Sequence, residues 1–110
     1  MTVQSICQIE KFWREHTKKG NEFFNAEQFS EALSKYDEGL QIAKKLNLKE
    51  EECLRFKIPF IQILVINYNN IANTYFKLNK FDTSEDFFAK VLWYLICLLY
   101  TSDAADDGLS

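Results

Sequence analysis

Residues 18–40 read KKGNEFFNAEQFSEALSKYDEGL, and this stretch decides the fold. Its small and aromatic residues lie three, four or seven positions apart, which places them on one face of two successive helices. The segment from Asn25 to Gln28 interrupts this spacing and predicts a short turn. The predicted buried positions are Ile9, Trp13, His16, Gly20 and Phe23 in the first helix, and Phe29, Ala32, Leu33, Tyr36 and Leu40 in the second.

The same pattern returns 52 residues later, in the stretch NYNNIANTYFKLNKFDTSEDFFAKVL at positions 67–92. Sliding the chain by this offset places Phe23 on Tyr75 and Tyr36 on Phe88. Only 3 Gly and 1 Pro occur in 110 residues, so the turn residues that an all-β chain needs are scarce. The sequence therefore predicts an all-α fold of two helix-turn-helix hairpins.

These hairpins resemble tetratricopeptide repeats, and the first resembles the opening repeat of chaperone-binding adaptors. The matching positions are Gly20, Phe23, Phe29, Ala32 and Tyr36 in the first copy, and Ala72, Tyr75, Phe81, Phe88 and Leu92 in the second. The departures are Gly39, Ser84 and Val91, where the family usually has Ala. The resemblance implies a fragment of an α-solenoid.

The connection between the repeats is longer than usual, because a standard repeat has about 34 residues. We expect repeat one at about 10–45, an extended connection at 46–60 and repeat two at about 61–92. The acidic run from Lys49 to Glu52 predicts a fresh helix start. Pro59 either kinks that helix or begins a new one. Long first connections of this sort are similar to those of the large immunophilins and related co-chaperones.

The end of the chain fits neither repeat. Cys97 to Asp106 resembles the translation of ten consecutive codons of a transposase adapter used in sequencing libraries. The alternative is a genuine acidic tail. We expect residues 93–110 to be a junction and a non-native tail, and the gene to be truncated near Leu92. The missing third repeat would leave the end of repeat two exposed and prone to self-association.

The composition excludes several classes of function. The three aspartates of the tail account for the whole formal charge of −3, so residues 1–96 have no net charge. They lack the excess of positive charge that is typical of proteins that bind nucleic acid. The apolar run at 91–100 has about half the length that a membrane span needs. Cys7, Cys53 and Cys97 form neither a disulfide framework nor a zinc motif. We expect a cytoplasmic protein with no metal, no cofactor and no membrane contact.

The resemblance also implies a binding site. In the chaperone-binding family, Lys and Asn side chains on the first helices of successive repeats grip the C-terminal carboxylate of a peptide. Asn21 and Asn70 occupy the two asparagine positions, whereas Thr17 stands where the first repeat has its lysine. Lys77 follows Asn70 by two helical turns and is a further candidate, although a solvated lysine is the simpler interpretation. Carboxylate binding is therefore expected to be weak or absent.

The sequence leaves three functions open. The first is a co-chaperone-type module that binds a peptide C-terminus, such as that of a heat shock chaperone ending in EEVD. The second is a scaffold without carboxylate specificity, which Thr17 favours. The third is the tetratricopeptide part of a truncated peptidyl-prolyl isomerase or phosphatase. In this chain itself we expect binding without catalysis, with His16 in the core and the thiols idle.

Overall fold

Five helices form the part of the chain described by the computed structural model, which gives the backbone of residues 3–109 and the side chains of residues 6–100. They are α1 (Val3–Asn25), α2 (Phe29–Asn47), α3 (Glu50–Arg55), α4 (Phe60–Lys77) and α5 (Phe81–Leu109). Residues 3–109 contain no β-strand. The prediction of an all-α fold is confirmed.

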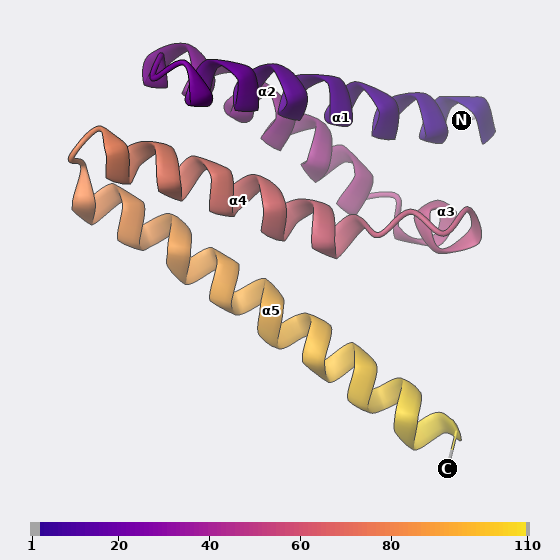
Figure 1. Cartoon of the computed structure of the whole chain (residues 1–110). Helices are drawn as coiled ribbons and strands as arrows, with labels where there is room; N and C mark the ends of the chain where they lie inside the picture. Colours follow the sequence, from indigo (N-terminus) through magenta and orange to yellow (C-terminus); the bar gives the residue numbers. More distant parts are fainter. Residues whose placement is uncertain (1–2, 110) are drawn as a thin grey trace.

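The long helices pack as two hairpins, α1 with α2 and α4 with α5, and α2 packs against α4 to join them (Figure 1). As a result, α1 and α4 run in the same direction, and α5 lies at the outer end of the stack (Figure 1). The predicted pair of helix-turn-helix units is confirmed. The first helix of each pair carries the predicted site residues.

The two hairpin turns have the same backbone geometry, 52 residues apart. Glu27 and Asn79 both adopt a left-handed conformation, with φ of 62° and 63°. After each of them a backbone N–H reaches back five residues, from Gln28 to the carbonyl of Phe23 and from Lys80 to that of Tyr75, both at 2.9 Å. This is the Schellman arrangement, which satisfies carbonyls at a helix end. The repeat in the sequence is therefore also a repeat of the backbone.

Small residues let the two helices of each hairpin approach closely, as predicted. A Cβ atom added to Gly20 would lie 2.5 Å from the ring of Tyr36, so no side chain fits there. The equivalent contact in the second hairpin is polar, since the Ser84 hydroxyl donates to the carbonyl of Ala72 at 2.8 Å. Serine in place of the family's usual alanine is therefore accommodated by a buried hydrogen bond.

The core lies mainly between α2 and α4. A fully buried aliphatic side chain stabilises a fold by about 1.5–3 kcal/mol, so this interface supplies much of the stability. Its buried residues include Tyr36, Leu40, Ala43 and Leu46 on α2, and Ile63, Leu64, Tyr68 and Ile71 on α4.

The extended connection contains the short helix α3. It begins at Glu50 with three acidic residues in its first turn, which confirms the predicted helix start. Cys53 is buried, and its thiol donates to the carbonyl of Leu46 at 3.3 Å. Pro59 is the N-cap of α4, so it begins a new helix and does not kink an existing one.

The end of repeat two is open to solvent, as predicted from the absence of a third repeat. Phe87, Phe88 and Val91 are half-buried and Leu92 is exposed. The apolar run that follows does not fold back onto them, because α5 continues as one helix to Leu109. The predicted non-native tail extends beyond the described side chains, and its origin stays a prediction.

Phe81, a position of the second repeat that matches the family pattern, is not buried. Phe81 begins α5 and is 53% exposed, because no further helix covers this corner of the described structure. Its ring packs edge-on against Phe76, with 5.2 Å between the ring centroids. Phe29, its counterpart in repeat one, is half-buried and packs edge-on against Phe24 at 5.3 Å.

Candidate functional site

A buried amide connects the two helices that carry the predicted site. The indole Nε1 of Trp13 on α1 donates to Oδ1 of Asn67 on α4 at 2.8 Å. Nδ2 of Asn67 donates in turn to the backbone carbonyl of Tyr36 on α2 at 2.9 Å. Asn67 is 1% exposed, so one side chain satisfies polar groups from two other helices inside the core. The sequence analysis missed this residue.

The predicted site residues follow this contact in the same order along α1 and α4. Thr17 lies one turn after Trp13, and Asn21 one turn further. On α4, Asn70 lies one turn after Asn67 and Lys77 about two turns further. The two helices run in the same direction, so the four residues lie along neighbouring helices (Figure 1). We call these four residues the α1–α4 face.

Thr17 is half-buried and offers no charge. Its Oγ1 atom is buried and has no hydrogen-bond partner among the described residues. An unpaired buried hydroxyl costs roughly 1–3 kcal/mol, so this position is slightly unfavourable for the fold. The position that carries the lysine in the chaperone-binding family therefore neither supplies a cation nor presents its hydroxyl to solvent.

Asn21 is exposed, but it also belongs to the packing of the first hairpin. The Tyr36 hydroxyl donates to its Oδ1 at 2.5 Å. An asparagine amide has two N–H donors besides this oxygen, and the bond to Tyr36 does not use them. The tyrosine thus orients Asn21 while leaving donors for a carboxylate or a peptide carbonyl.

Burial raises the pKa of the Tyr36 hydroxyl to about 12. In the unfolded chain a tyrosine has a pKa of about 10. Tyr36 therefore holds its proton more tightly in the folded state than in the unfolded chain. The resulting stabilisation of the fold is complete below about pH 10 and is lost as the pH rises towards 12.

We expect the free energy of unfolding to fall between about pH 10 and 12, and Tyr36→Phe to remove part of that fall. Urea unfolding at a series of pH values would measure both slopes. An unchanged slope in the variant would contradict the assignment to Tyr36.

Asn70 and Lys77 lie further from the core than Asn67 does. Asn70 is half-buried, and its backbone carbonyl accepts a hydrogen bond from the Thr74 hydroxyl at 2.7 Å. Lys77 is exposed in the last turn of α4. The face therefore presents two amides and one peripheral lysine, without a cation at Thr17.

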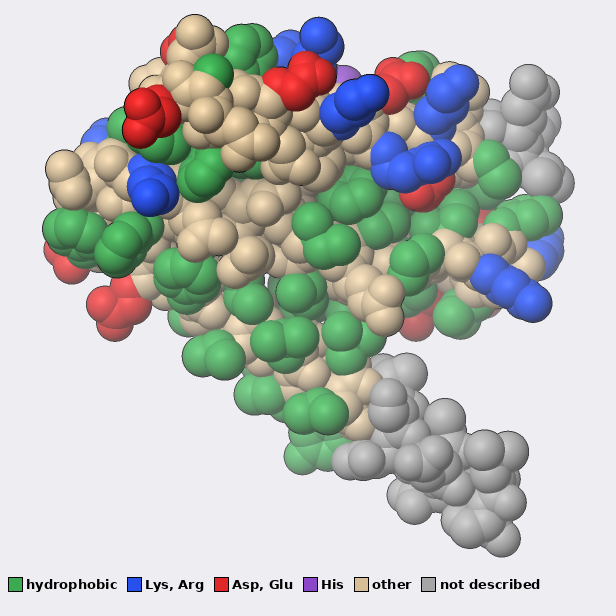
Figure 2. All heavy atoms as spheres, in the orientation of Figure 1, with side chains coloured by type: hydrophobic (Ala, Val, Ile, Leu, Met, Phe, Trp, Pro, Cys, Tyr) green, Lys and Arg blue, Asp and Glu red, His purple; other side chains and the backbone are tan. Residues whose placement is uncertain are grey.

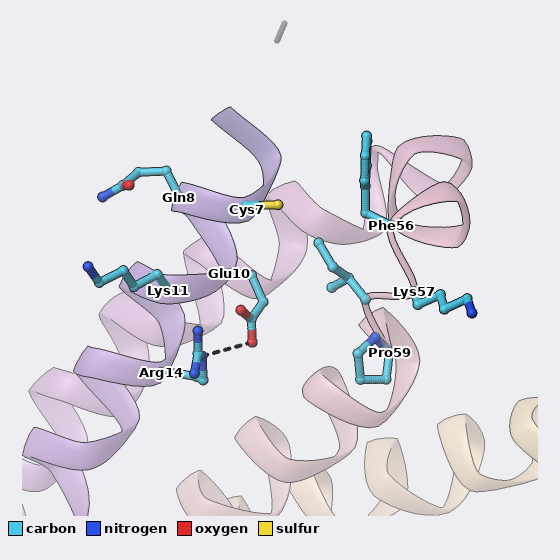
Figure 3. Close-up of a pocket in the computed structure, with 9 residues that line it drawn as sticks. Cys7, Gln8, Glu10, Lys11, Arg14, Phe56, Lys57 and Pro59 are labelled. Atoms are coloured by element: carbon cyan, nitrogen blue, oxygen red, sulfur yellow. Dashed lines mark ion pairs between the residues drawn. The ribbon is translucent and has the colours of Figure 1, made fainter. Parts of the chain in front are cut away.

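The side of α1 that carries Thr17 and Asn21 continues towards the start of the helix, where it borders an open hollow of about 500 Å³. Glu10 and Arg14 precede Thr17 by seven and three residues, and their side chains form an ion pair at 3.0 Å. Figure 3 shows this pair between α1 and the connection that leads into α4, whereas Gln8 and Lys11 project away from the connection. The lining residues are Cys7, Gln8, Glu10, Lys11, Arg14, Phe56, Lys57, Ile58 and Pro59.

Arg14 is the second site residue that the sequence analysis missed. It looks like an ordinary surface arginine in the sequence. The signal that could have found it is its spacing, because Glu10, Arg14, Thr17 and Asn21 recur every three or four residues along one helix face. Arg14 is thus the cation on α1 that precedes Thr17 on this stripe.

His16 lies between the first two helices. Its Nε2 is 2.9 Å from a carboxylate oxygen of Glu38, and its Nδ1 is 2.9 Å from the backbone carbonyl of Phe12. His16 had been predicted to lie in the core. Its ring is half-buried and lies at the edge of the core.

The cysteines and acidic residues form no reactive cluster in the described residues. Burial, followed by the charges of Glu52 and Glu50, raises the pKa of the Cys53 thiol, which disfavours the thiolate. No group of three or more His, Cys, Asp or Glu in the described residues could hold a metal ion. No helix in this part of the chain is long and apolar enough to cross a membrane.

Comparison with known proteins adds one relative and one family. The relative is the Hsp70-Hsp90 organising protein of Plasmodium falciparum (isolate 3D7), which is 32% identical over 102 residues. The match covers 71% of this chain and 18% of that protein, so the chain spans less than a fifth of the relative. No solved structure gives a significant match. A family profile matches residues 11–106, which is most of the chain, and the chain therefore belongs to the family described as "Protein of unknown function (DUF2753)".

Proposed function

We propose that this chain is a protein-binding module of the tetratricopeptide type, which binds an extended peptide along the α1–α4 face and works without catalysis. The observation that carries the proposal is the hydrogen bond between Trp13 on α1 and Asn67 on α4, two helices that run in the same direction. Asn21 on α1 and Asn70 on α4 supply the amide side chains of the proposed site. Stacked helical hairpins commonly use the first helices of their repeats as a binding groove.

The distant relative supports the same class of function. Its name describes a protein that organises Hsp70 and Hsp90, and its similarity to this chain covers 71% of the chain. We infer a co-chaperone-type partner, with the C-terminus of a heat shock chaperone as the first candidate. Such a peptide ends in Glu-Glu-Val-Asp and carries both acidic side chains and a carboxylate.

The charges along α1 favour the binding of an acidic peptide. They predict only weak binding of its C-terminal carboxylate. Arg14 and Lys57 line the hollow, and each could pair with a glutamate of the ligand. Glu10 already pairs with Arg14, which reduces the positive charge available. Since Thr17 supplies no cation, neutral amides must orient the carboxylate, and they bind it less strongly than charged donors.

An NMR titration of the full chain with an eight-residue peptide ending in Glu-Glu-Val-Asp tests this proposal, because it detects binding even at millimolar affinity. We expect saturable shifts of backbone amides around Asn21 and Asn70. Asn70→Ala should weaken the binding several-fold while leaving the other helices unperturbed. The matched control is Asn47→Ala, an exposed asparagine at the end of α2 and away from the face.

Two outcomes would separate this proposal from its alternatives. A peptide with an amidated C-terminus that binds equally well would favour a scaffold that recognises the peptide without its carboxylate. Thr17 favours that second candidate. The absence of any shift at millimolar peptide, in a folded chain, would overturn binding of this peptide class on the α1–α4 face.

A further inference from the structure

The hollow beside the first half of α1 has an excess of positive charge. Lys11, Arg14 and Lys57 line it, against the one carboxylate of Glu10. In Figure 2, Lys and Arg side chains gather over α1, interspersed with acidic ones, whereas the described part of α5 is mainly hydrophobic. The balance of charge in the hollow therefore favours an acidic group of a ligand.

The ion pair with Glu10 holds Arg14 in place without occupying its whole guanidinium group. It joins Nε of Arg14 to Oε2 of Glu10 at 3.0 Å. The terminal amino groups of the guanidinium keep their N–H donors. The side chain of Arg14 is 63% exposed, and Figure 3 shows it between α1 and the connection. Arg14 therefore presents hydrogen-bond donors at the edge of the hollow, and Glu10 positions them.

Lys57 lies on the wall that the connection forms, and its backbone is held by the end of α3. Its φ of 57° is left-handed. The N–H of Ile58 donates to the carbonyl of Cys53 at 2.8 Å, which closes α3 in the Schellman arrangement also found at the hairpin turns. Lys57 itself is exposed. The second cation of the hollow is thus placed by hydrogen-bonded backbone.

The hollow lies at a defined distance from the amides of the α1–α4 face. Arg14 precedes Asn21 by seven residues, which is about 10 Å along the helix axis. Glu10, near the middle of the wall formed by α1, precedes it by eleven residues, or about 16 Å. An extended peptide advances about 3.3 Å per residue. A peptide whose last residue lies at Asn21 therefore brings its fourth residue from the end to Arg14 and its sixth into the hollow.

We propose that the hollow is a second subsite, which selects peptides with an acidic side chain at the sixth residue from the C-terminus. This inference rests on the proposed function, since it takes the carboxylate at Asn21 as its starting point. Side chains of an extended peptide alternate, so the fourth and sixth residues point to the same side. The fourth pairs with Arg14 and the sixth with Lys57. The recognised motif then has six residues, two more than Glu-Glu-Val-Asp.

Three peptides of equal length test the subsite in NMR titrations of the full chain. The first is Ala-Ala-Glu-Ala-Glu-Glu-Val-Asp, and the others carry Ala or Lys at the sixth position from the end. At low salt we expect the peptide with Glu to bind about three- to fivefold more tightly than that with Ala, because it gains one exposed ion pair. The peptide with Lys should bind most weakly, and added salt should reduce both differences.

Reversing the charge of Lys57 tests the assigned partner. Lys57→Glu should prefer the peptide with Lys over the peptide with Glu at the sixth position. The matched control is Lys19→Glu, an exposed lysine on α1. It follows Thr17 by two residues, so its side chain points about 200° away around the helix, and the original preference should persist. Far-UV circular dichroism must first show the same helicity in both variants.

The outcomes separate the subsite from the proposed function. Equal binding of the three peptides would overturn the subsite and leave peptide binding on the α1–α4 face intact. Equal effects of Lys57→Glu and Lys19→Glu would also overturn it, because the net charge of the chain would then explain the preference. If none of the three peptides binds to the folded chain, the subsite and the proposed function both fall.

Discussion

Replacing Asn67 with leucine is expected to lower the free energy of unfolding by about 3 kcal/mol or more, although the two side chains have similar volume. The substitution removes the acceptor of the Trp13 indole and the donor to the Tyr36 carbonyl. Both groups would stay buried without a partner, and each then costs roughly 1–3 kcal/mol. Two hairpins alone have limited stability, so the loss is a large fraction of the total.

Urea unfolding followed by circular dichroism would measure this effect. Asn73→Leu is the matched control, since Asn73 lies on the same helix but is exposed. It should change the stability by less than about 0.5 kcal/mol. A variant Asn67→Leu within 1 kcal/mol of the original chain would contradict the role of this amide.

The small and aromatic pattern predicted the hairpins correctly because it follows from close packing. The ring of Tyr36 leaves room only for glycine at position 20. Pairs of this kind appear in the sequence as small and aromatic residues that recur at helical spacing. The turn that contains Glu27 was located from the interruption of this pattern, and the structure repeats that turn at Asn79. Their left-handed backbone was not predicted, because neither residue is a glycine.

Asn67 could not be recognised in the same way. It stands in the run NYNN, where three of four consecutive residues are asparagines, a residue type that is more often exposed than buried. Only the contacts distinguish it from Asn69 and Asn70, since its partners come from α1 and α2, 54 and 31 residues away. Long-range hydrogen bonds of this kind leave no periodic signal.

The candidate site stays a prediction from the family resemblance, and the structure adds details of it that the sequence could not give. The departure at Thr17 was visible by matching the chain to the family, but the burial of its hydroxyl was not. The hollow near Arg14 depends on how the extended connection returns towards α1, and local spacing does not determine that path. The open face of α5 was expected from the absence of a third repeat.

Thr17→Lys is expected to convert the α1–α4 face into a stronger carboxylate site. Thr17 lies one turn before Asn21, the separation at which the chaperone-binding family places its lysine and asparagine. The stem of a lysine can run along the half-buried position while its ammonium reaches solvent. The change also removes a buried hydroxyl that has no partner among the described residues, so the fold should tolerate it.

The gain should come from one charge-assisted hydrogen bond to the peptide carboxylate, worth about 1.5–3 kcal/mol. This corresponds to an increase in affinity of roughly ten- to a hundredfold for a peptide ending in Glu-Glu-Val-Asp. Isothermal titration of the two chains at low and high salt would measure it. The gain should shrink as salt screens the new charge.

Two controls isolate the charge from the length of the side chain. Thr17→Met has a similar reach without a cation, so it should bind no more tightly than the original chain. An amidated peptide removes the carboxylate and should abolish the advantage of Thr17→Lys. If the lysine variant binds both peptides equally, its ammonium contacts the acidic side chains of the ligand and not its terminus. If it binds neither better than the original chain does, the α1–α4 face does not hold the carboxylate, because a cation one turn from Asn21 could not then be near it.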